Sequence, residues 1–169
     1  MKRILKASFA ISVLSVMAIV LTAASNPKAT GDIKWDNTSA GTKAHVVFNA
    51  LATSADSANG VDAKGSLLYD DGTYVYTMDV KYIKVIGNTA WFAGVVTANP
   101  GDQKCCAVGH WIFYTVQDNG ERGIGSDKVW GEDLGAVDST VALARVMNGS
   151  FPLGGPFGIT GGNLQVHNK

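Results

Sequence analysis

Apolar residues recur at every second position along much of this chain. The clearest example is residues 74–82, where Tyr76, Met78 and Val80 alternate with polar side chains. Successive side chains of an extended strand point to opposite faces, so this alternation predicts a strand with one buried face.

Residues 83–86 continue this strand with the opposite apolar parity, which predicts a β-bulge near Tyr82. Gly87 and Asn88 then interrupt the pattern, and a second strand-like run follows over residues 89–97. Two such runs around a Gly-Asn pair are typical of a tight hairpin.

A third predicted strand, residues 108–117, is bulky on both faces. Ile112 and Tyr114 lie on one face, and Trp111 and Phe113 lie on the other. A strand of this kind is expected to be packed on both sides.

Shorter strand candidates fill the rest of the chain: residues 45–50, 65–69, 128–130, 141–146 and 163–167. Residues 137–147 also fit the spacing of one short helix. About eight short strands separated by turn residues predict an all-β, antiparallel fold, either a closed or partly open β-barrel or a β-sandwich.

The domain organisation expected from this pattern is simple. Residues 25–42 are polar and small, which predicts a flexible lead-in before a single β-domain over residues 43–169. Residues 149–162 are rich in glycine and proline and are expected to form a long loop before the last strand.

The first 24 residues have the pattern of a secretory signal peptide. Three basic residues in the first six positions precede an uncharged apolar run over residues 7–24. Small residues end this run and suit cleavage after Ala24 or Ser25. An uncleaved membrane anchor is the alternative, because the run approaches the roughly 20 residues that span a bilayer. We expect cleavage, and a secreted or periplasmic protein.

Removal of the signal changes the charge balance. Loss of Lys2, Arg3 and Lys6 lowers the number of basic residues from 14 to 11, against 14 acidic residues. A mildly acidic chain lacks the basic patch that nucleic acids and anionic membranes require, so neither partner is expected.

Four short motifs are spaced along the chain: VIGNTAW at 85–91, GVVT at 94–97, VQDNGE at 116–121 and GGNLQVH at 161–167. Together they resemble a family of small secreted bacterial proteins that are rich in β-strands. The resemblance covers about residues 45–167. The family has no assigned activity, so the resemblance implies a secreted β-domain and no particular chemistry.

One candidate metal site lies at the third motif. Asp118, Asn119, Glu121 and Asp127 place four oxygen-bearing side chains within ten residues. Calcium prefers oxygen ligands from a flexible loop, which makes these residues a candidate calcium site. The alternative is an ordinary hairpin turn, because Asp-Asn-Gly favours turns by itself.

Cys105 and Cys106 are adjacent and are the chain's two cysteines. In an oxidising compartment they are candidates for a vicinal disulfide, and free thiols or a bridge to another chain are the alternatives. Metal binding by the pair is less favoured, because zinc sites usually space paired cysteines by two to four residues.

The three histidines offer a weaker possibility. If the sheet closes, His45 and His167 could become neighbours and share a metal or a proton, whereas surface positions explain both equally well. His110 lies on the apolar face of its predicted strand, which favours a buried position in the core.

No nucleophile motif, zinc-protease motif or phosphate-binding loop occurs. The chain does contain four tryptophans and five tyrosines, which could line a cavity for a small apolar or sugar ligand.

We therefore expect an exported, non-enzymatic binding domain. One alternative is an enzyme that uses a barrel cavity with His110, Tyr76 or Tyr114 inside. Another is a structural or adhesive module with an exposed aromatic face.

Overall fold

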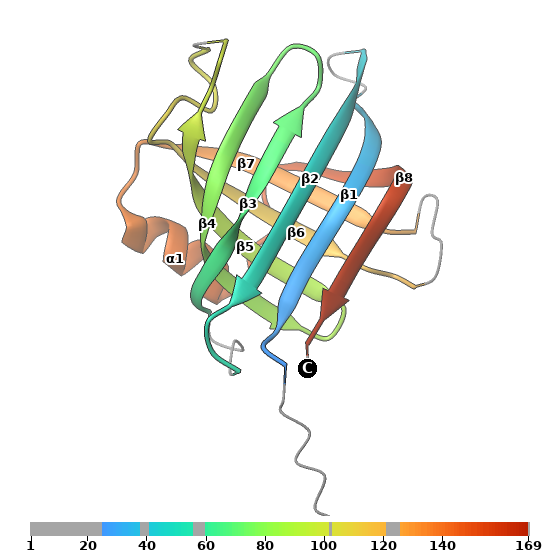
Figure 1. The fold of residues 1–169 in the computed structure, drawn as a ribbon, viewed down its shortest axis with the longest axis vertical. Coiled ribbons are helices and arrows are strands. Elements are labelled where there is room, and N and C mark those ends of the chain that lie inside the picture. Colours follow the sequence, from blue (N-terminus) through green and yellow to red (C-terminus); the bar gives the residue numbers. More distant parts are fainter. Residues whose placement is uncertain (1–24, 38–40, 56–59, 102, 121–125, 169) are drawn as a thin grey trace, which may run out of the picture.

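The computed structural model describes residues 25–37, 41–55, 60–101, 103–120 and 126–168. Within these ranges, eight antiparallel strands form a closed barrel in sequence order, and the first strand pairs with the last (Figure 1). The prediction of a closed antiparallel barrel is thus confirmed. The strands are β1 (Lys28–Asn37), β2 (Thr42–Ala52), β3 (Val61–Asp70), β4 (Val75–Ile86), β5 (Thr89–Ala98), β6 (Trp111–Gln117), β7 (Lys128–Gly135) and β8 (Gly154–His167).

The predicted alternation in β4 determines which side chains enter the barrel. Tyr76, Met78 and Val80 are buried in the interior. The pairing with β5 then shifts its register between Val80 and Tyr82, and Ile83 becomes the next interior residue. The expected bulge and the change of apolar parity therefore coincide. The two-residue turn at residues 87–88 is also present.

The double-sided burial of β6 has a simple cause. A ten-residue helix, α1 (Ser139–Asn148), packs on the outside of the barrel. Its Ala142 and Val146 form a second core with Trp111 and Phe113 of β6 and with Trp91 of β5. One face of β6 therefore fills the barrel, and the other lies under the helix.

Residues 137–147 were compatible with either a strand or a short helix, and the structure shows the helix α1. The carboxylate of Asp138 accepts a hydrogen bond from the Thr140 backbone N–H and caps the helix start. Gly149 ends the helix in the left-handed conformation, with a φ of 61°. The strand candidate at 141–146 is therefore wrong.

Two other predicted irregular segments are strands. Residues 25–42, expected to be a flexible lead-in, contain β1, which pairs along its length with β2 and β8. Small residues on the interior face of β1 concealed its periodicity. At Gly31, for example, a Cβ would lie 2.3 Å from the Phe48 ring, so the large side chain comes from the neighbouring strand.

Residues 149–162, expected to be a long loop, contribute most of β8. The backbones of β8 and its neighbours approach closely, which requires glycine. A Cβ on Gly154 would lie 2.5 Å from the Gly131 carbonyl oxygen, and one on Gly162 would lie 1.9 Å from that of Asp32. The glycines that suggested a loop thus serve close strand packing.

The two ends of the barrel differ. The first and last described strands begin and end at the lower end in Figure 1, where Lys28 lies opposite His167. The β1–β2, β3–β4 and β5–β6 connections lie at the other end, called the upper end below. No helix among the described residues is long and apolar enough to cross a membrane.

Candidate functional site

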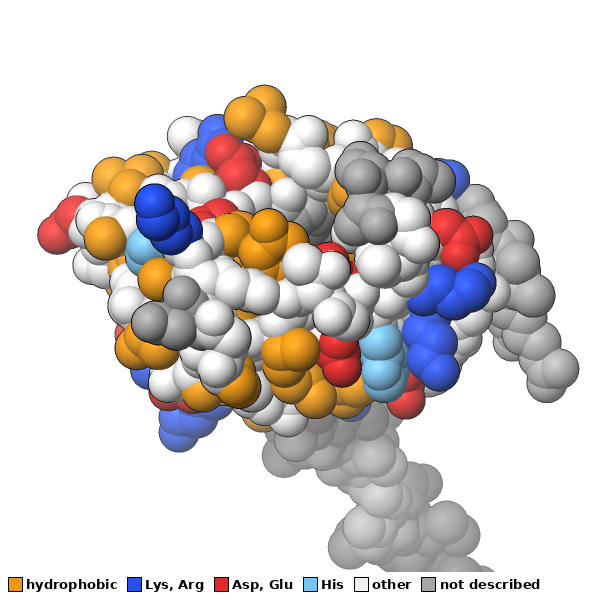
Figure 2. All heavy atoms as spheres, turned by 90° about the horizontal axis from the view of Figure 1, so that it is seen from above, with side chains coloured by type: hydrophobic (Ala, Val, Ile, Leu, Met, Phe, Trp, Pro, Cys, Tyr) orange, Lys and Arg blue, Asp and Glu red, His pale blue; other side chains and the backbone are white. Residues whose placement is uncertain are grey.

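A cavity of about 210 Å³ opens at the upper end of the barrel. Six of the residues that line it are aromatic: Trp35, Tyr69, Tyr74, Tyr76, Tyr114 and Phe157. Seen from above, hydrophobic side chains lie among polar ones between the loops of this end (Figure 2). Buried apolar side chains of the core pack inside the barrel below this cavity.

The aromatic rings of the wall stack on one another. Trp35 of β1 stacks on Phe157 of β8 with ring centres 5.8 Å apart, and Tyr69 stacks on Tyr76 at 5.0 Å. Trp35 also contacts Tyr69 at 6.1 Å. The contacts join four strands into one apolar wall, and this packing holds the rings in fixed positions.

Two buried tyrosines form the floor of the cavity. The hydroxyl groups of Tyr76 and Tyr114 share a hydrogen bond of 2.6 Å, and the Tyr114 ring stacks on Phe92 of the neighbouring strand β5. Burial raises the pKa of both phenols, and for Tyr76 the nearby Tyr114 adds to the rise. Both therefore stay neutral and can donate or accept hydrogen bonds at physiological pH.

Asp71 organises the β3–β4 turn beside the cavity. Its carboxylate accepts hydrogen bonds from the Tyr69 hydroxyl at 2.9 Å and from the Asn37 amide at 3.1 Å. Backbone N–H groups of Thr73 and Tyr74 donate to its other oxygen. Burial alone would raise the pKa of Asp71, but these hydrogen bonds outweigh burial and lower it. The negatively charged Asp71 carboxylate thus accepts the Tyr69 hydroxyl and holds the Tyr69 ring in position.

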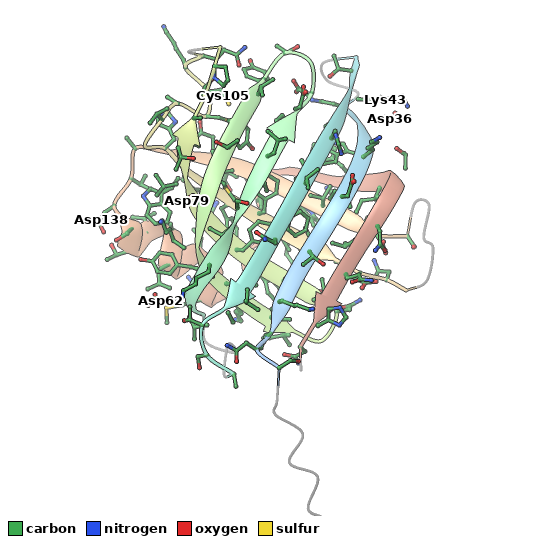
Figure 3. The ribbon with its side chains drawn as sticks, viewed as in Figure 1. Asp36, Lys43, Asp62, Asp79, Cys105 and Asp138 are labelled. Carbon is green, nitrogen blue, oxygen red and sulfur yellow. The ribbon has the colours of Figure 1, made fainter. Side chains whose placement is uncertain are left out.

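Cys105, labelled in Figure 3, and Cys106 lie in the β5–β6 connection. Both cysteines line the same cavity. Cys105 is exposed and Cys106 is buried, and their Sγ atoms lie 3.0 Å apart as free thiols. The side-chain amide of Asn99 donates to the carbonyl oxygens of both residues. Burial and then the neighbouring Cys105 raise the pKa of the Cys106 thiol.

Asp133 of β7 faces the cysteine pair. Its carboxylate accepts the Cys106 backbone N–H at 2.7 Å and the Gly135 backbone N–H at 2.8 Å. Nδ1 of His110 lies 3.0 Å from the same carboxylate. Burial would raise the pKa of Asp133, but the hydrogen bonds from Cys106 and His110 outweigh burial and lower it. His110 is thus a half-buried partner of Asp133 and lies outside the core.

Three of the candidate calcium residues, Asp118, Asn119 and Asp127, lie at the far end of β6 from the cavity. Asp118 accepts the backbone N–H groups of Gly120 and Val166, and Asp127 accepts that of Asn119. The bonds from Gly120 and Asn119 lie within the connection between β6 and β7, and the bond from Val166 ties this connection to β8. Glu121 lies outside the described residues. The calcium site stays a prediction, as does the vicinal disulfide.

The suggested pair of His45 and His167 is wrong. His45 lies opposite Lys34 and contacts Asp32 at 2.8 Å, whereas His167 lies opposite Lys28. The two positions are six residues apart along β1, about 20 Å in a strand. In the closed barrel, β2 and β8 lie on either side of β1. The two histidines nevertheless lie at different levels along the barrel axis.

Sequence reasoning identified part of this site. It named the cysteine pair and the aromatic residues Tyr76 and Tyr114, but it missed Asp71 and Asp133. Asp71 had the local signal of a turn, Asp-Asp-Gly, which gives no hint of a cavity. Asp133 reaches the cysteines only through the pairing of β6 with β7, so no local signal could have placed it there.

A comparison of the chain with protein families, with curated proteins and with solved structures gives no match. The resemblance to secreted β-rich proteins stays a prediction, and the chemistry of this chain has to be argued from its own geometry.

Proposed function

We propose that this protein is an exported binding protein that holds a small ligand in the cavity at the upper end of its barrel. The observation that carries the proposal is the cavity of about 210 Å³ with a stacked aromatic wall and a hydroxyl-bearing floor. Eight-stranded barrels have room for one small ligand. Export rests on the pattern of the first 24 residues.

The size of the cavity supports a small ligand. Sites for drug-sized molecules usually have volumes of about 300–1,000 Å³, so this cavity suits a smaller molecule. Ring faces offer good stacking to a flat apolar group, and the floor hydroxyls of Tyr76 and Tyr114 offer hydrogen bonds. A compact aromatic molecule with a hydroxyl or N–H group fits these features.

The charges around the cavity support a neutral ligand. Asp71 and Asp133 are ionised, Glu132 pairs with Arg145, and no lysine or arginine is among the described lining residues. An anion would meet negative charge without a partner, and burial of an unpaired charge is costly. Carboxylate-bearing ligands are therefore disfavoured.

The pKa shifts support binding over acid–base catalysis. A general acid or base works best with a pKa near the working pH. The pKa values of Tyr76, Tyr114 and Cys106 are displaced upwards from their ordinary values, away from neutrality. Such groups serve as fixed hydrogen-bond partners, which is what a binding site needs. An adhesive role is less supported, because the aromatic side chains gather in the cavity and under α1.

Isothermal titration of the purified mature chain tests this proposal. Indole and phenol serve as neutral aromatic probes, benzoate as the anionic probe and methyl glucoside as the sugar probe. We expect indole or phenol to bind and benzoate to bind at least tenfold more weakly. Phe157→Ala removes part of the wall and should weaken binding, whereas Phe151→Ala changes an exposed phenylalanine outside the lining and should not.

Two results would contradict the proposal. Equal loss of binding in the Phe157 and Phe151 variants would show that the probe binds elsewhere. Binding of methyl glucoside in preference to the aromatic probes would show that the ligand chemistry is that of a sugar.

A further inference from the structure

The two cysteine sulfurs and one carboxylate form a compact group of potential metal ligands. Sγ of Cys105, Sγ of Cys106 and a carboxylate oxygen of Asp133 all lie within 4.8 Å of one another. Within the described ranges, no other group of three histidine, cysteine or acidic side chains meets this condition. All three residues line the cavity at the upper end.

The backbone explains how adjacent cysteines can act together. Neighbouring side chains in an extended segment point to opposite sides. Cys106 instead has a φ of 58°, and it is the one non-glycine residue with positive φ in the described part of the chain. This uncommon conformation accompanies a sulfur–sulfur distance of 3.0 Å, and the Asn99 amide holds both cysteine carbonyl groups. The two sulfurs are therefore close enough to share one ion, although zinc sites usually separate paired cysteines by two to four residues.

The carboxylate is held in place by its own partners. His110 and the backbone N–H groups of Cys106 and Gly135 contact Asp133. Hydrogen-bonded partners of this kind orient metal ligands in known sites and strengthen binding. Asp133 is thus fixed on β7 while the cysteines come from the β5–β6 connection, so the ligands converge from two separate elements.

We propose that Cys105, Cys106 and Asp133 bind a thiophilic divalent cation of the zinc class at the rim of the cavity. Binding exchanges two thiol protons for the metal, so two thiolates and one carboxylate surround one divalent ion. Sulfurs on a tetrahedral zinc lie about 3.8 Å apart, since each Zn–S bond is about 2.3 Å. Metal binding would therefore move the two sulfurs apart from their present distance of 3.0 Å. Three protein ligands leave one coordination position for water or a ligand donor.

This inference does not depend on the ligand-binding function. A vicinal disulfide uses the same two sulfurs, so the oxidised chain could not bind the ion through them. The two states are therefore mutually exclusive, and the test must begin with fully reduced protein.

Cobalt is a suitable probe because its bonds to thiolate sulfur absorb light. We would reduce the mature chain, confirm two free thiols per chain under anaerobic conditions, and titrate with cobalt(II). A sulfur-to-cobalt charge-transfer band that saturates at one ion per chain, and that disappears when zinc is added, is the expected result. Cys105→Ser and Cys106→Ser should each abolish the band, and Asp133→Asn should weaken cobalt binding at least tenfold.

Asp36→Asn is the matched control. Asp36 is also a carboxylate at the upper end, but it pairs with Lys43 at 2.9 Å and lies outside the cysteine group (Figure 3). Its variant should bind cobalt like the original chain. The proposal is overturned if the reduced protein shows no band at equimolar cobalt. It is also overturned if either serine variant keeps the band, or if Asp133→Asn binds cobalt as tightly as Asp36→Asn.

Discussion

At the scale of single residues, two carboxylates, buried Asp71 and half-buried Asp133, hold the upper end together. Asp71 receives four hydrogen bonds and joins the β3–β4 turn to the end of β1 through Asn37. Asp133 joins β7 to the β5–β6 connection through Cys106 and His110. Both accept hydrogen bonds while charged, so both have lowered pKa values. We therefore expect protonation of these carboxylates in acid to weaken the loops of this end.

Asp71→Asn should destabilise the protein at neutral pH and have less effect in acid. The pKa of Asp71 is lower in the folded state than its unfolded value of about 3.9. Its contribution is therefore complete above that value and is lost as the pH falls through the folded pKa. We expect a loss of about 1–3 kcal/mol at neutral pH, measured by urea unfolding.

The neighbouring Asp70 provides the control for this prediction. Asp70 is exposed and accepts one backbone hydrogen bond, from Gly72. Asp70→Asn should change the free energy of unfolding by less than about 0.5 kcal/mol. A Tm difference between Asp71→Asn and the original chain that stays constant from neutral pH down to about pH 3 would contradict this interpretation.

At the scale of elements, the β-bulge between β4 and β5 requires a glycine. A Cβ at Gly94 would lie 2.3 Å from the Asp79 carbonyl oxygen and 3.1 Å from the Val80 Cα atom. Both contacts are with backbone atoms of the paired strand, which cannot move without breaking the pairing. The bulge in turn brings Ile83 into the core. One glycine thus supports the change of apolar parity that is visible in the sequence.

Gly94→Ala should therefore destabilise the barrel by about 1–3 kcal/mol, the usual cost of overpacking a well-packed site. Gly161→Ala is the matched control, because a Cβ there meets no atom within 4 Å. Thermal unfolding followed by circular dichroism would compare the two variants. Equal Tm values for the two would show that β4 can shift to accommodate a methyl group.

The elements that could be predicted from sequence are those with large alternating side chains. β4, β5 and β6 contain such side chains, and their period-2 pattern gave their positions and the hairpin between β4 and β5. β1 and the first part of β8 could not be recognised, because small residues and glycines occupy positions where another strand's backbone or ring lies close. Their role depends on partners far away in the sequence. The same reason explains why Asp133 could not be assigned to the cysteine pair.

At the scale of the whole molecule, the pairing of β1 with β8 closes the barrel. Gly162 lies at this seam with a φ of 96°, and a Cβ would approach the Asp32 carbonyl oxygen to 1.9 Å. Side chains at such a φ are strained in any case. Both the positive φ and the close approach of the β1 backbone therefore favour glycine at position 162. Closure also gives each of the eight described strands two neighbours.

Gly162→Ala should lower the Tm more than Gly161→Ala, by several degrees, because it disturbs the closing strand pair. Since the barrel is one closed sheet, we expect tryptophan fluorescence and far-ultraviolet circular dichroism to report the same transition in both variants. Separate transitions in the Gly162 variant would show that part of the barrel is stable without closure.

The meeting of β1 and β8 at the lower end has a practical consequence. Lys28 and His167 are opposite each other in the sheet, so a short linker could join these strands and make a circularly permuted chain. New termini could be opened at the Gly87-Asn88 turn. A fluorescent protein or a surface attached at either strand end would lie at the end opposite the cavity. The fold can therefore be immobilised with its upper cavity facing the solution.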